Sequence, residues 1–532
     1  MLRLTNLSLP LDYDREALRK AVLNRLRVPP KQLRSLKLHR RSIDARDKRD
    51  IHFNLSVDVT LADESGVRRR LKAAQAQPVS PEKLPTLPPC RFEQPPVVVG
   101  AGPAGLFAAL TLARAGAKPV LIERGRPVEE RMADVAAMRE TGVLNPESNV
   151  QFGEGGAGTF SDGKLNTGIK SPWSRFVLET FVACGGPEDI LIDQLPHIGT
   201  DRLRQVVAAM RREIIAAGGT VRFSTRLTSL LLKGSRVTGL QLKAPEGEAE
   251  LQTDAVLLCI GHSARDTAQR LFNQGVRMVA KPFAMGVRIE HLQSAVNQAQ
   301  YGTMAGHPVL GAAPYKLHVP TADGRGVYTF CMCPGGEVVA AASQPGGVVT
   351  NGMSNYARDG INANAALLVG VRPEDFGDDH PLSGFVLQRS LEQAAFRAGG
   401  GDFRAPAQRV EDFLASRPST GFGDVLPSYC PGVTPCDLHS FLPEYITGNL
   451  AFGLRRMDQQ LKGFAHPDAV LTGIESRSSS PVRLPRGADC QAEGLDGLFP
   501  AGEGAGYAGG IVSAAVDGIR AAIAAMERSV LL

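Results

Sequence analysis

The first part of the chain alternates between strand-like and helix-like patterns of apolar residues. Within Ile51–Leu61, apolar residues occupy every second position, which is typical of a strand with one buried face. Arg15–Leu26 has apolar residues at helical spacing and predicts an amphipathic helix. Leu2–Leu9 and Leu33–Arg41 are two further predicted strands. These elements together predict a small α+β domain at the N-terminus.

A change of pattern occurs at Val97. Val97–Val99 is a short apolar run, Ala104–Ala115 is a helix of small residues, and Pro119–Glu123 is a second strand. This order of strand, glycine turn, helix and strand is typical of a βαβ unit. The tail, Gly497–Glu527, repeats the order of strand, glycine turn and helix.

The predicted fold class is therefore α/β, with a Rossmann-type dinucleotide-binding domain, an inserted α+β substrate or cap domain and a small N-terminal α+β domain. The expected boundaries are 1–75 for the N-terminal module, 76–95 for a linker, 96–274 together with 471–532 for the discontinuous dinucleotide-binding domain, which the motifs below assign to FAD, and 275–470 for the substrate or cap domain. A chain of 532 residues is long enough for two or three domains.

Charge and proline content support the separate N-terminal module. Residues 1–72 contain 18 Lys/Arg and 9 Asp/Glu, whereas the rest of the chain contains 42 and 45, so the positive excess lies in the module. Gln77–Pro96 contains seven prolines, which disfavour both helix and sheet and predict a stiff, extended spacer.

The bulk composition, with 43% hydrophobic and 21% charged residues, is typical of a globular protein. No apolar run approaches the ~18 residues of a membrane helix, and Met1–Leu11 has no secretion signal. The eight cysteines show no zinc or redox spacing of the C-x-x-C kind. We therefore expect a cytoplasmic protein that contacts no membrane and has no metal site.

The strongest motif follows the first strand of the βαβ unit. Gly100, Gly102 and Gly105 have the spacing at which glycines allow a tight turn, a close approach to a pyrophosphate, and close packing of helix on sheet. Glu123 ends the next strand, where a carboxylate would accept hydrogen bonds from ribose hydroxyls. The dinucleotide-binding residues predicted in this segment are Gly100, Gly102, Pro103, Ala104, Gly105, Glu123 and Arg124.

The C-terminal tail favours FAD over NAD. Gly497–Gly504 resembles the second FAD signature of flavoprotein reductases, with Glu503 in place of the usual aspartate. A carboxylate there would bond the ribityl chain, and the N-terminus of the next helix would face the flavin. Ala255–Ile260 predicts an intermediate strand that ends beside the cofactor. The predicted contacts from these segments are Gly261, Gly502, Glu503, Gly510 and Ile511.

Gln151–Leu165 is a second glycine-rich stretch. It lacks the G-K-[ST] ending of a phosphate-binding loop, because Lys164 is followed by Leu165. We expect the backbone at Gly156 and Gly158 to line the pyrophosphate or isoalloxazine, with Lys164 near a negative charge. The alternative is a flexible surface loop.

At the level of whole motifs, the chain resembles the bacterial FAD-dependent dehydrogenase family, also described as NAD(FAD)-utilizing dehydrogenases, within the glutathione-reductase-like flavoproteins. The segments that carry the resemblance are Arg41–Arg46, Gly100–Gly105, Gly155–Leu165, His197–Asp201, Lys281–Glu290, Cys331–Gly336, Asn351–Ser354 and Glu475–Arg483. The resemblance implies FAD and an oxidoreductase activity, and it supplies no substrate.

Candidate reactive residues lie outside the FAD motifs. Glu475, Arg477 and Arg483 belong to a polar run that we expect to stay out of the core, and they are candidate catalytic contacts to an anionic substrate. The alternative is a loop that holds the cofactor or a domain interface. Cys331 and Cys333 would share one face of a strand, so a redox role and simple burial both remain open.

No second G-x-G-x-x-G unit follows Gly261, so we expect no resident NAD(P)H domain. NAD(P)H as a transient donor and an electron-donor protein both remain open as the source of electrons.

The predicted function is an FAD-dependent oxidoreductase that passes hydride or electrons through flavin N5, with a small-molecule substrate under the cap. One alternative is a flavin-dependent RNA-modifying enzyme that grips phosphates through the basic module; against it, the module shows few aromatic residues for base stacking. The second alternative is a non-catalytic flavin-binding regulator.

Overall fold

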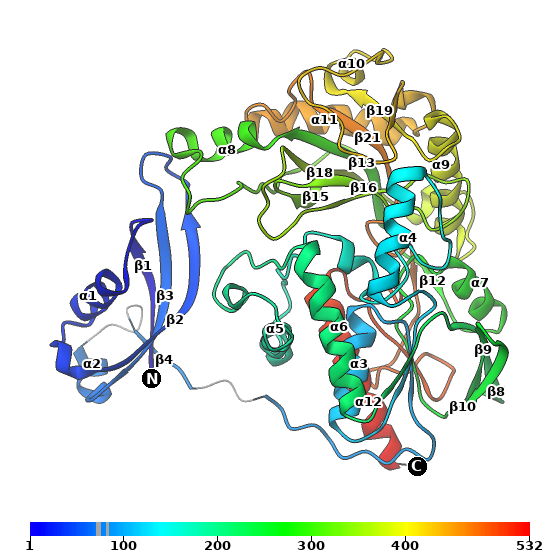
Figure 1. Ribbon diagram of the computed structural model, residues 1–532, viewed down its shortest axis with the longest axis horizontal. Helices are drawn as coiled ribbons and strands as arrows, with labels where there is room; N and C mark the ends of the chain where they lie inside the picture. The colour runs from blue at the N-terminus through cyan, green and yellow to red at the C-terminus, as the bar shows by residue number, and fades with distance from the viewer. Residues whose placement is uncertain (71–75, 81–83, 532) are drawn as a thin grey trace.

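The computed structural model describes residues 1–70, 76–80 and 84–531. Parts of two expected segments, 71–75 of the N-terminal module and 81–83 of the linker, lie outside the described residues. Figure 1 shows three parts: a blue N-terminal sheet to one side, a parallel α/β domain below, and a cap built around a second large sheet above it.

The N-terminal part is a four-stranded antiparallel sheet in the order β2-β3-β1-β4. Its elements are β1 (Leu2–Leu9), α1 (Arg15–Leu26), β2 (Leu33–Asp44), β3 (His52–Leu61), α2 (Glu64–Arg70) and β4 (Gln77–Pro78). The three strands and the helix α1 predicted from apolar periodicity are present. Strand β4 pairs with β1, so the first residues of the expected linker belong to the sheet.

A five-stranded parallel sheet forms the centre of the FAD-binding domain, in the order β23-β11-β5-β6-β7. Its strands are β5 (Val97–Val99), β6 (Val120–Ile122), β7 (Thr220–Arg222), β11 (Val256–Leu258) and β23 (Leu498–Pro500). Because β23 comes from the tail and pairs with β11, the last part of the chain completes this sheet. The Rossmann-type α/β fold with inserted domains is confirmed.

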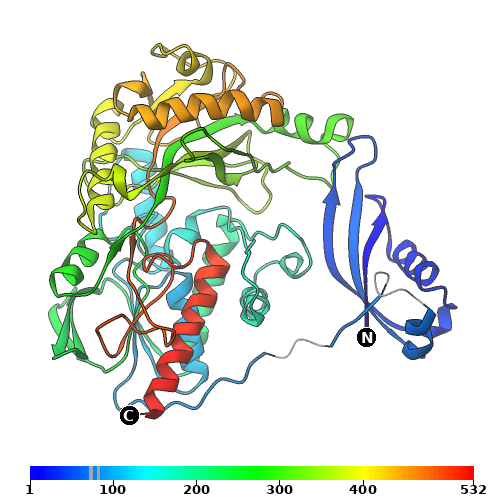
Figure 2. The same ribbon diagram turned by 180° about the vertical axis from the view of Figure 1, so that it is seen from behind.

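The helices of this domain are α3 (Pro103–Arg114), α4 (Val128–Thr141), α5 (Pro172–Ala183), α6 (Thr200–Ala216), α7 (Arg265–Asn273) and α12 (Ile511–Leu531). Helices α3, α5, α6 and α12 cover one face of the parallel sheet, and α7 packs on the other face together with a smaller antiparallel sheet, so the central strands of the parallel sheet are wholly apolar. Helices α3 and α12 pack against each other (Figures 1 and 2). A Cβ at Gly518 would overlap the carbonyl oxygen of Ala104, so this contact requires glycine.

A three-stranded antiparallel sheet lies between β7 and β11 in the sequence. It contains β8 (Arg226–Lys233), β9 (Arg236–Ala244) and β10 (Gly247–Gln252). Strands β8 and β9 each carry buried apolar residues, whereas β10 is almost entirely exposed and lacks an apolar face.

The cap is built on a seven-stranded sheet in the order β14-β15-β18-β13-β21-β19-β20. The strands are β13 (Phe283–Leu292), β14 (His318–Val319), β15 (Val327–Cys333), β18 (Asn362–Val371), β19 (Ala405–Arg409), β20 (Val433–Pro435) and β21 (Val470–Glu475). The helices are α8 (Gln293–Tyr301), α9 (Ser383–Gly399), α10 (Val410–Leu414) and α11 (Glu444–Gln460), and β16 (Glu337–Ala340) pairs with β17 (Thr350–Met353).

Two short strands, β12 (Val279–Ala280) and β22 (Val482–Arg483), pair where the chain enters and leaves the cap. Strand β21 pairs with β13 and β19 and therefore belongs to the cap sheet, although we expected the chain to return to the FAD-binding domain at residue 471. Within the described residues, no helix is long and apolar enough to cross a membrane.

The N-terminal part contacts the rest of the molecule through Arg41 on β2. The Arg41 guanidinium bonds the carboxylate of Asp193 at 2.7 and 3.1 Å. The Arg41 backbone also pairs with Ile192 and Gln194. The tip of the β2–β3 hairpin adjoins the cap, since Lys48 lies next to Gly302. In Figure 2 the module lies to one side of the molecule, with the tip of its β2–β3 hairpin next to the cap.

This arrangement predicts that residues 84–532 fold and hold the cofactor without the module. The parallel sheet and its turns contain no residue before 84, whereas Leu87, Cys90 and Phe92 pack on the core of the FAD-binding domain and must be kept. We expect a soluble, yellow truncated chain with the flavin content of the full chain, measured by gel filtration and absorbance. Arg41→Ala in the full chain is the matched control, and a colourless or aggregated truncated chain would contradict the prediction.

Candidate functional site

Three segments far apart in the sequence meet at the first glycine turn. A Cβ on Gly102 would lie 3.9 Å from the Cα of Gly156, and a Cβ on Gly158 would lie 3.4 Å from the side chain of Ile511 and 3.8 Å from that of Pro103. Gly156 has a φ of 61°, in the left-handed region that favours glycine. The turn after β5, the glycine-rich loop and the start of α12 therefore surround one narrow space.

The tail and the strand β11 complete this arrangement. A Cβ on Gly502 would come within 2.8 Å of the Ala104 side chain, and one on Gly504 within 2.5 Å of the Gly261 carbonyl oxygen. Gly510, with a φ of 91°, directly precedes α12. We call the backbone around these glycines and the Gly102 turn the glycine cradle.

Close packing explains the two remaining glycines of the first motif. Gly100 has a φ of 101°, and a Cβ there would overlap the Cys259 carbonyl oxygen. A Cβ on Gly105 would overlap the Gly100 carbonyl oxygen, so α3 can lie close to the sheet only with glycine at this position.

Glu123 holds the turns of the cradle together. Its carboxylate accepts backbone N–H groups from Ala101 at 2.8 Å, Gly125 at 2.9 Å and Gly153 at 3.0 Å. The side chain is buried, and three of its lone-pair directions are thereby used. Its position next to the Gly102 turn is the one expected for a group that reaches the ribose, and the ribose contact stays a prediction.

Arg124 lies in an ion-pair network beside the cradle. Its guanidinium bonds Asp266 and Glu147, both at 2.9 Å, and stacks over the Phe152 ring at 4.0 Å from the centroid. The Arg124 guanidinium is therefore bound by groups of the protein itself, and these contacts hold the start of the glycine-rich loop near β6.

Arg131 organises the glycine-rich loop, although it was not predicted. From α4, its fully buried guanidinium donates to the backbone carbonyls of Asn149, Val150, Glu154 and Gly156 at 2.6 to 3.0 Å. Burial lowers the pKa of Arg131 to about 10. In the sequence this residue looks like a polar position on an amphipathic helix, so nothing in the pattern distinguishes it.

These residues fit a dinucleotide such as FAD. Helix α3 begins at Pro103 without a side-chain cap on its first N–H groups, which suits an anionic pyrophosphate. At the other end of the cradle, the Nε2 atom of His262 is buried and has no hydrogen-bond partner within the described part of the chain. A bound cofactor or substrate would supply the missing partner.

A charged cluster adjoins Glu503 at the junction with the cap. The Nδ1 atom of His262 lies 3.6 Å from the Glu503 carboxylate. Burial and the nearby charge of Arg483 lower the pKa of Lys281. Arg483 is exposed and lies over the Tyr507 ring at 5.2 Å from the centroid. Lys281 therefore interacts with both Arg483 and Glu503, and His262 lies beside Glu503, where β12 and β22 connect the domains.

Arg477 was expected in a run that stays out of the core, and this expectation was wrong. Its guanidinium is buried and bonds both oxygens of Glu392 at 3.0 Å, with a third bond to Ser343. Arg265 from α7 bonds the same carboxylate at 2.7 and 2.9 Å. These charges hold the pKa of Glu392 far below its usual range, although burial opposes this. The two guanidinium nitrogens of Arg477 that could bind a substrate carboxylate therefore already bond Glu392.

Glu475 is paired in the same way. It is buried at the end of β21, and its two oxygens accept bonds from Arg288 at 2.9 and 3.0 Å. Of the three candidate substrate contacts, the structure therefore leaves Arg483 exposed and engages Glu475 and Arg477 in buried ion pairs.

Lys164 extends from the glycine-rich loop to the cap sheet. Its ammonium lies 3.1 Å from the Asp162 carboxylate and 3.9 Å from the Cys333 sulfur. Asp162 in turn bonds Arg358 at 2.6 and 2.9 Å and the Ser354 hydroxyl. The expected negative partner of Lys164 is therefore a protein carboxylate.

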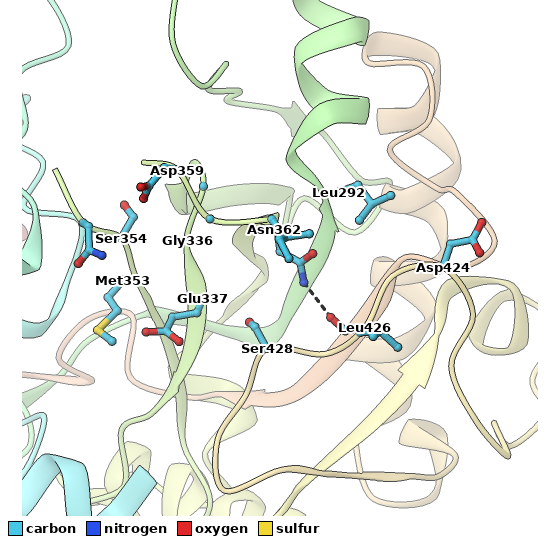
Figure 3. A pocket seen from close by; sticks show the side chains of 14 residues that line it. Leu292, Gly336, Glu337, Met353, Ser354, Asp359, Asn362, Asp424, Leu426 and Ser428 are labelled. Atoms are coloured by element: carbon cyan, nitrogen blue, oxygen red, sulfur yellow. Dashed lines mark hydrogen bonds between the residues drawn. The ribbon is translucent and has the colours of Figure 1, made fainter. Parts of the chain in front are cut away.

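A cavity of about 560 Å³ lies within the cap and is lined by residues between Leu292 and Ser428. Figure 3 shows Glu337, Ser354 and Asp359 on one side of it and Asp424 and other residues on the other. None of its fourteen lining residues is Lys, Arg or His, so the cavity is unsuited to an anion.

Fold and cradle together define an FAD-binding protein. Residues 93–141 match the family described as FAD binding domain, and residues 282–478 match that described as FAD-dependent protein, C-terminal domain-like. Residues 1–60 match a domain of unknown function, DUF8436.

Over almost its full length, the chain is 45% identical to an uncharacterized protein of Clostridium beijerinckii (strain ATCC 51743 / NCIMB 8052), covering 99% of both chains. It belongs to the same family as that protein. The family matches support an FAD-dependent oxidoreductase in general terms.

Two solved structures have a partial likeness to the chain. A geranylgeranyl bacteriochlorophyll reductase-like protein of Thermoplasma acidophilum is 11% identical, with a TM-score of 0.36 over 82% of this chain and 78% of that one. The quinol fumarate reductase subunit FrdA of E. coli is 13% identical, with a TM-score of 0.37 over 82% and 70%. Similarity at this level says nothing about activity.

Gly102→Val should remove the cofactor without unfolding the protein. The nearest protein atom to a Cβ at this position is 3.9 Å away, so the added side chain is tolerated by the chain and occupies the space of the pyrophosphate. We expect a folded, colourless protein by circular dichroism and absorbance. Gly168→Val is the control, because a Cβ there meets nothing within 4 Å, and full flavin content in Gly102→Val would refute the assignment.

Arg477→Lys and Arg483→Lys should differ in stability. Lysine cannot reproduce the two parallel bonds from Arg477 to Glu392, so we expect a loss of about 1.5 to 3 kcal/mol in the free energy of unfolding. Arg483 is exposed, so its replacement should change stability by less than about 0.5 kcal/mol. Thermal and denaturant unfolding measure both, and equal stability of the two variants would contradict the buried-pair assignment.

Proposed function

We propose that the protein is an FAD-dependent dehydrogenase whose cofactor lies along the glycine cradle. The pyrophosphate would lie at the Gly102 turn and the flavin near Gly502 and Glu503. When bound, FAD supplies two-electron chemistry by accepting or donating hydride at N5. The convergence of backbone from three distant segments on one narrow space is the observation that carries this proposal.

The chain's own groups would bind and orient the cofactor. The uncapped N–H groups at the start of α3 favour a pyrophosphate through hydrogen bonds and the helix dipole. Glu123 keeps one lone-pair direction for a ribose hydroxyl, and Glu503 is the corresponding carboxylate for the ribityl chain. The N-terminus of α12, directly after Gly510, would favour negative charge on the flavin edge.

A small anionic molecule is the substrate class that we propose. Lys281, Arg483 and His262 lie together at the junction between the FAD-binding domain and the cap, next to Glu503. A carboxylate or phosphate there would be bound by the exposed fork of Arg483 and oriented against the flavin. The acid-lined cavity of the cap has the opposite charge and is not our candidate for this anion.

For the electron donor, we propose that NADH or NADPH binds transiently at the flavin face, because the chain contains one dinucleotide fingerprint. Mixing the purified flavoprotein anaerobically with each nicotinamide should bleach the flavin band at a rate that rises with concentration. Stopped-flow absorbance measures this. Bleaching by dithionite but by neither nicotinamide would refute a nicotinamide donor.

Arg483→Gln tests the substrate part of the proposal. Removing the guanidinium should weaken the binding of an anionic competitor such as oxalate by about tenfold or more. Binding is measured by titrating oxalate and following the change that it causes in the flavin spectrum. The control is Arg486→Lys, whose guanidinium bonds Asp517 instead. Unchanged competitor binding in Arg483→Gln would place the anion elsewhere.

A further inference from the structure

Strand β15 ends in an irregularity that contains two cysteines, Cys331 and Cys333. Phe330 pairs with Ala366 and Cys333 pairs with Asn364, so three steps on β15 correspond to two on β18. The extra residue forms a β-bulge. Cys331 has a φ of 43°, in the left-handed region that non-glycine residues rarely adopt, and such strain tends to persist at functional sites.

The Cys333 thiol lies beside a positive charge and next to Cys331, whose thiol shares a hydrogen bond with it. The Cys333 sulfur lies 3.3 Å from the Cys331 carbonyl oxygen and 3.9 Å from the Lys164 ammonium. Arg288 donates to the Cys331 carbonyl at 3.0 Å. Two cations from two different domains therefore flank the pair.

The anions near the pair are already neutralised. Asp162 bonds Arg358 as well as Lys164, and Glu475 bonds Arg288. His197 also lies close to this cluster, and burial lowers its pKa, which favours the uncharged imidazole. Although burial opposes the charge of Lys164, the two cysteines and Asp162 raise its pKa.

Cys331 differs from the other thiols of the chain. The hydrogen bond from Cys333, followed by the charges of Lys164 and Arg288, lowers the pKa of Cys331 well below that of an ordinary thiol, while the same hydrogen bond raises that of Cys333. By contrast, burial raises the pKa of Cys90 and of Cys184. Cys331 is also partly exposed as a residue, whereas Cys333 is buried.

We propose that Cys331 and Cys333 form a redox-active dithiol that reduces small organic disulfides by thiol–disulfide exchange. Cys331 is the attacking thiol and Cys333 the resolving thiol. Lys164 is a positioning residue that stabilises the negative sulfur. This site is distinct from the glycine cradle and does not depend on the proposed dehydrogenase activity.

The exchange balances in two steps. Cys331 loses its proton to water, its sulfur attacks one sulfur of the disulfide, and the released thiolate takes a proton from water, which leaves a mixed disulfide on Cys331. Cys333 then loses its proton, attacks the Cys331 sulfur and releases the second thiol. In total, two protein thiols become one disulfide with loss of two electrons and two protons, and one organic disulfide becomes two thiols.

The test treats the purified full-length flavoprotein with 2-hydroxyethyl disulfide and maps its peptides by mass spectrometry. We expect a Cys331–Cys333 disulfide to form at least tenfold faster than mixed disulfide at Cys90, because the thiolate is the reacting form. Cys333→Ser should accumulate mixed disulfide on Cys331, and Cys331→Ser should leave Cys333 reduced. Cys90→Ser is the matched control and should react like the natural chain.

Lys164→Gln separates a reactive pair from a merely packed one. Removing the ammonium should slow the exchange about tenfold and shift its pH profile upward, which a structural role would not do. Flavin absorbance and thermal unfolding verify that each variant is folded. If a variant does not fold, the peptide mapping of the natural chain still tests the proposal. A Cys331–Cys333 segment that stays reduced in the native protein, or that reacts no faster than Cys90, overturns the proposal.

Discussion

The close approach of backbone to backbone around the Gly102 turn is the constraint on which the rest of the structure depends. The Gly102 turn meets the glycine-rich loop and the C-terminal tail there, the Gly261 turn adjoins the tail, and a Cβ at most of these glycines would touch or overlap another segment. Such contact leaves little room for side chains at these glycines, so main-chain N–H groups and helix ends border much of the space. Those groups favour an extended, anionic ligand such as a dinucleotide.

Buried ionic groups keep this space open. The carboxylate of Glu123 and the guanidinium of Arg131 satisfy backbone groups of the surrounding loops that would otherwise be buried without partners. Each charged group makes three or more bonds, which offsets its cost of leaving water. Removing either would strand several polar backbone groups at once, so the shape of the cradle and the stability of the domain are coupled.

Ion pairs also join the cap to the FAD-binding domain. Glu392 on α9 bonds Arg265 on α7, and Asp162 of the glycine-rich loop bonds Arg358 of the cap. Because these pairs are buried, water and salt screen them little, and they fix how the two domains meet. The cysteine pair of β15 lies at this junction and owes its charged surroundings to Lys164 from one domain and Arg288 from the other.

The sequence by itself determined the local elements and the cofactor class. Apolar periodicity located β1, α1, β3 and the βαβ unit at Val97. Burial of one face of an element produces a repeat of apolar residues that is visible within a short stretch of sequence. The glycine spacing and the matching tail indicated FAD. These signals are short in range and depend on residue type.

Only the tertiary structure decided which charged residues are free. In the sequence, Arg131, Arg477 and Arg483 look alike, and their difference lies in partners far along the chain, such as Glu392 for Arg477. The same holds for β10, whose exposed pairing leaves no apolar pattern, and for β21, whose place in the cap sheet depends on β13 and β19. The physical reason is that an ion pair or a strand pairing is a property of two distant segments, and a single sequence records each segment without its partner.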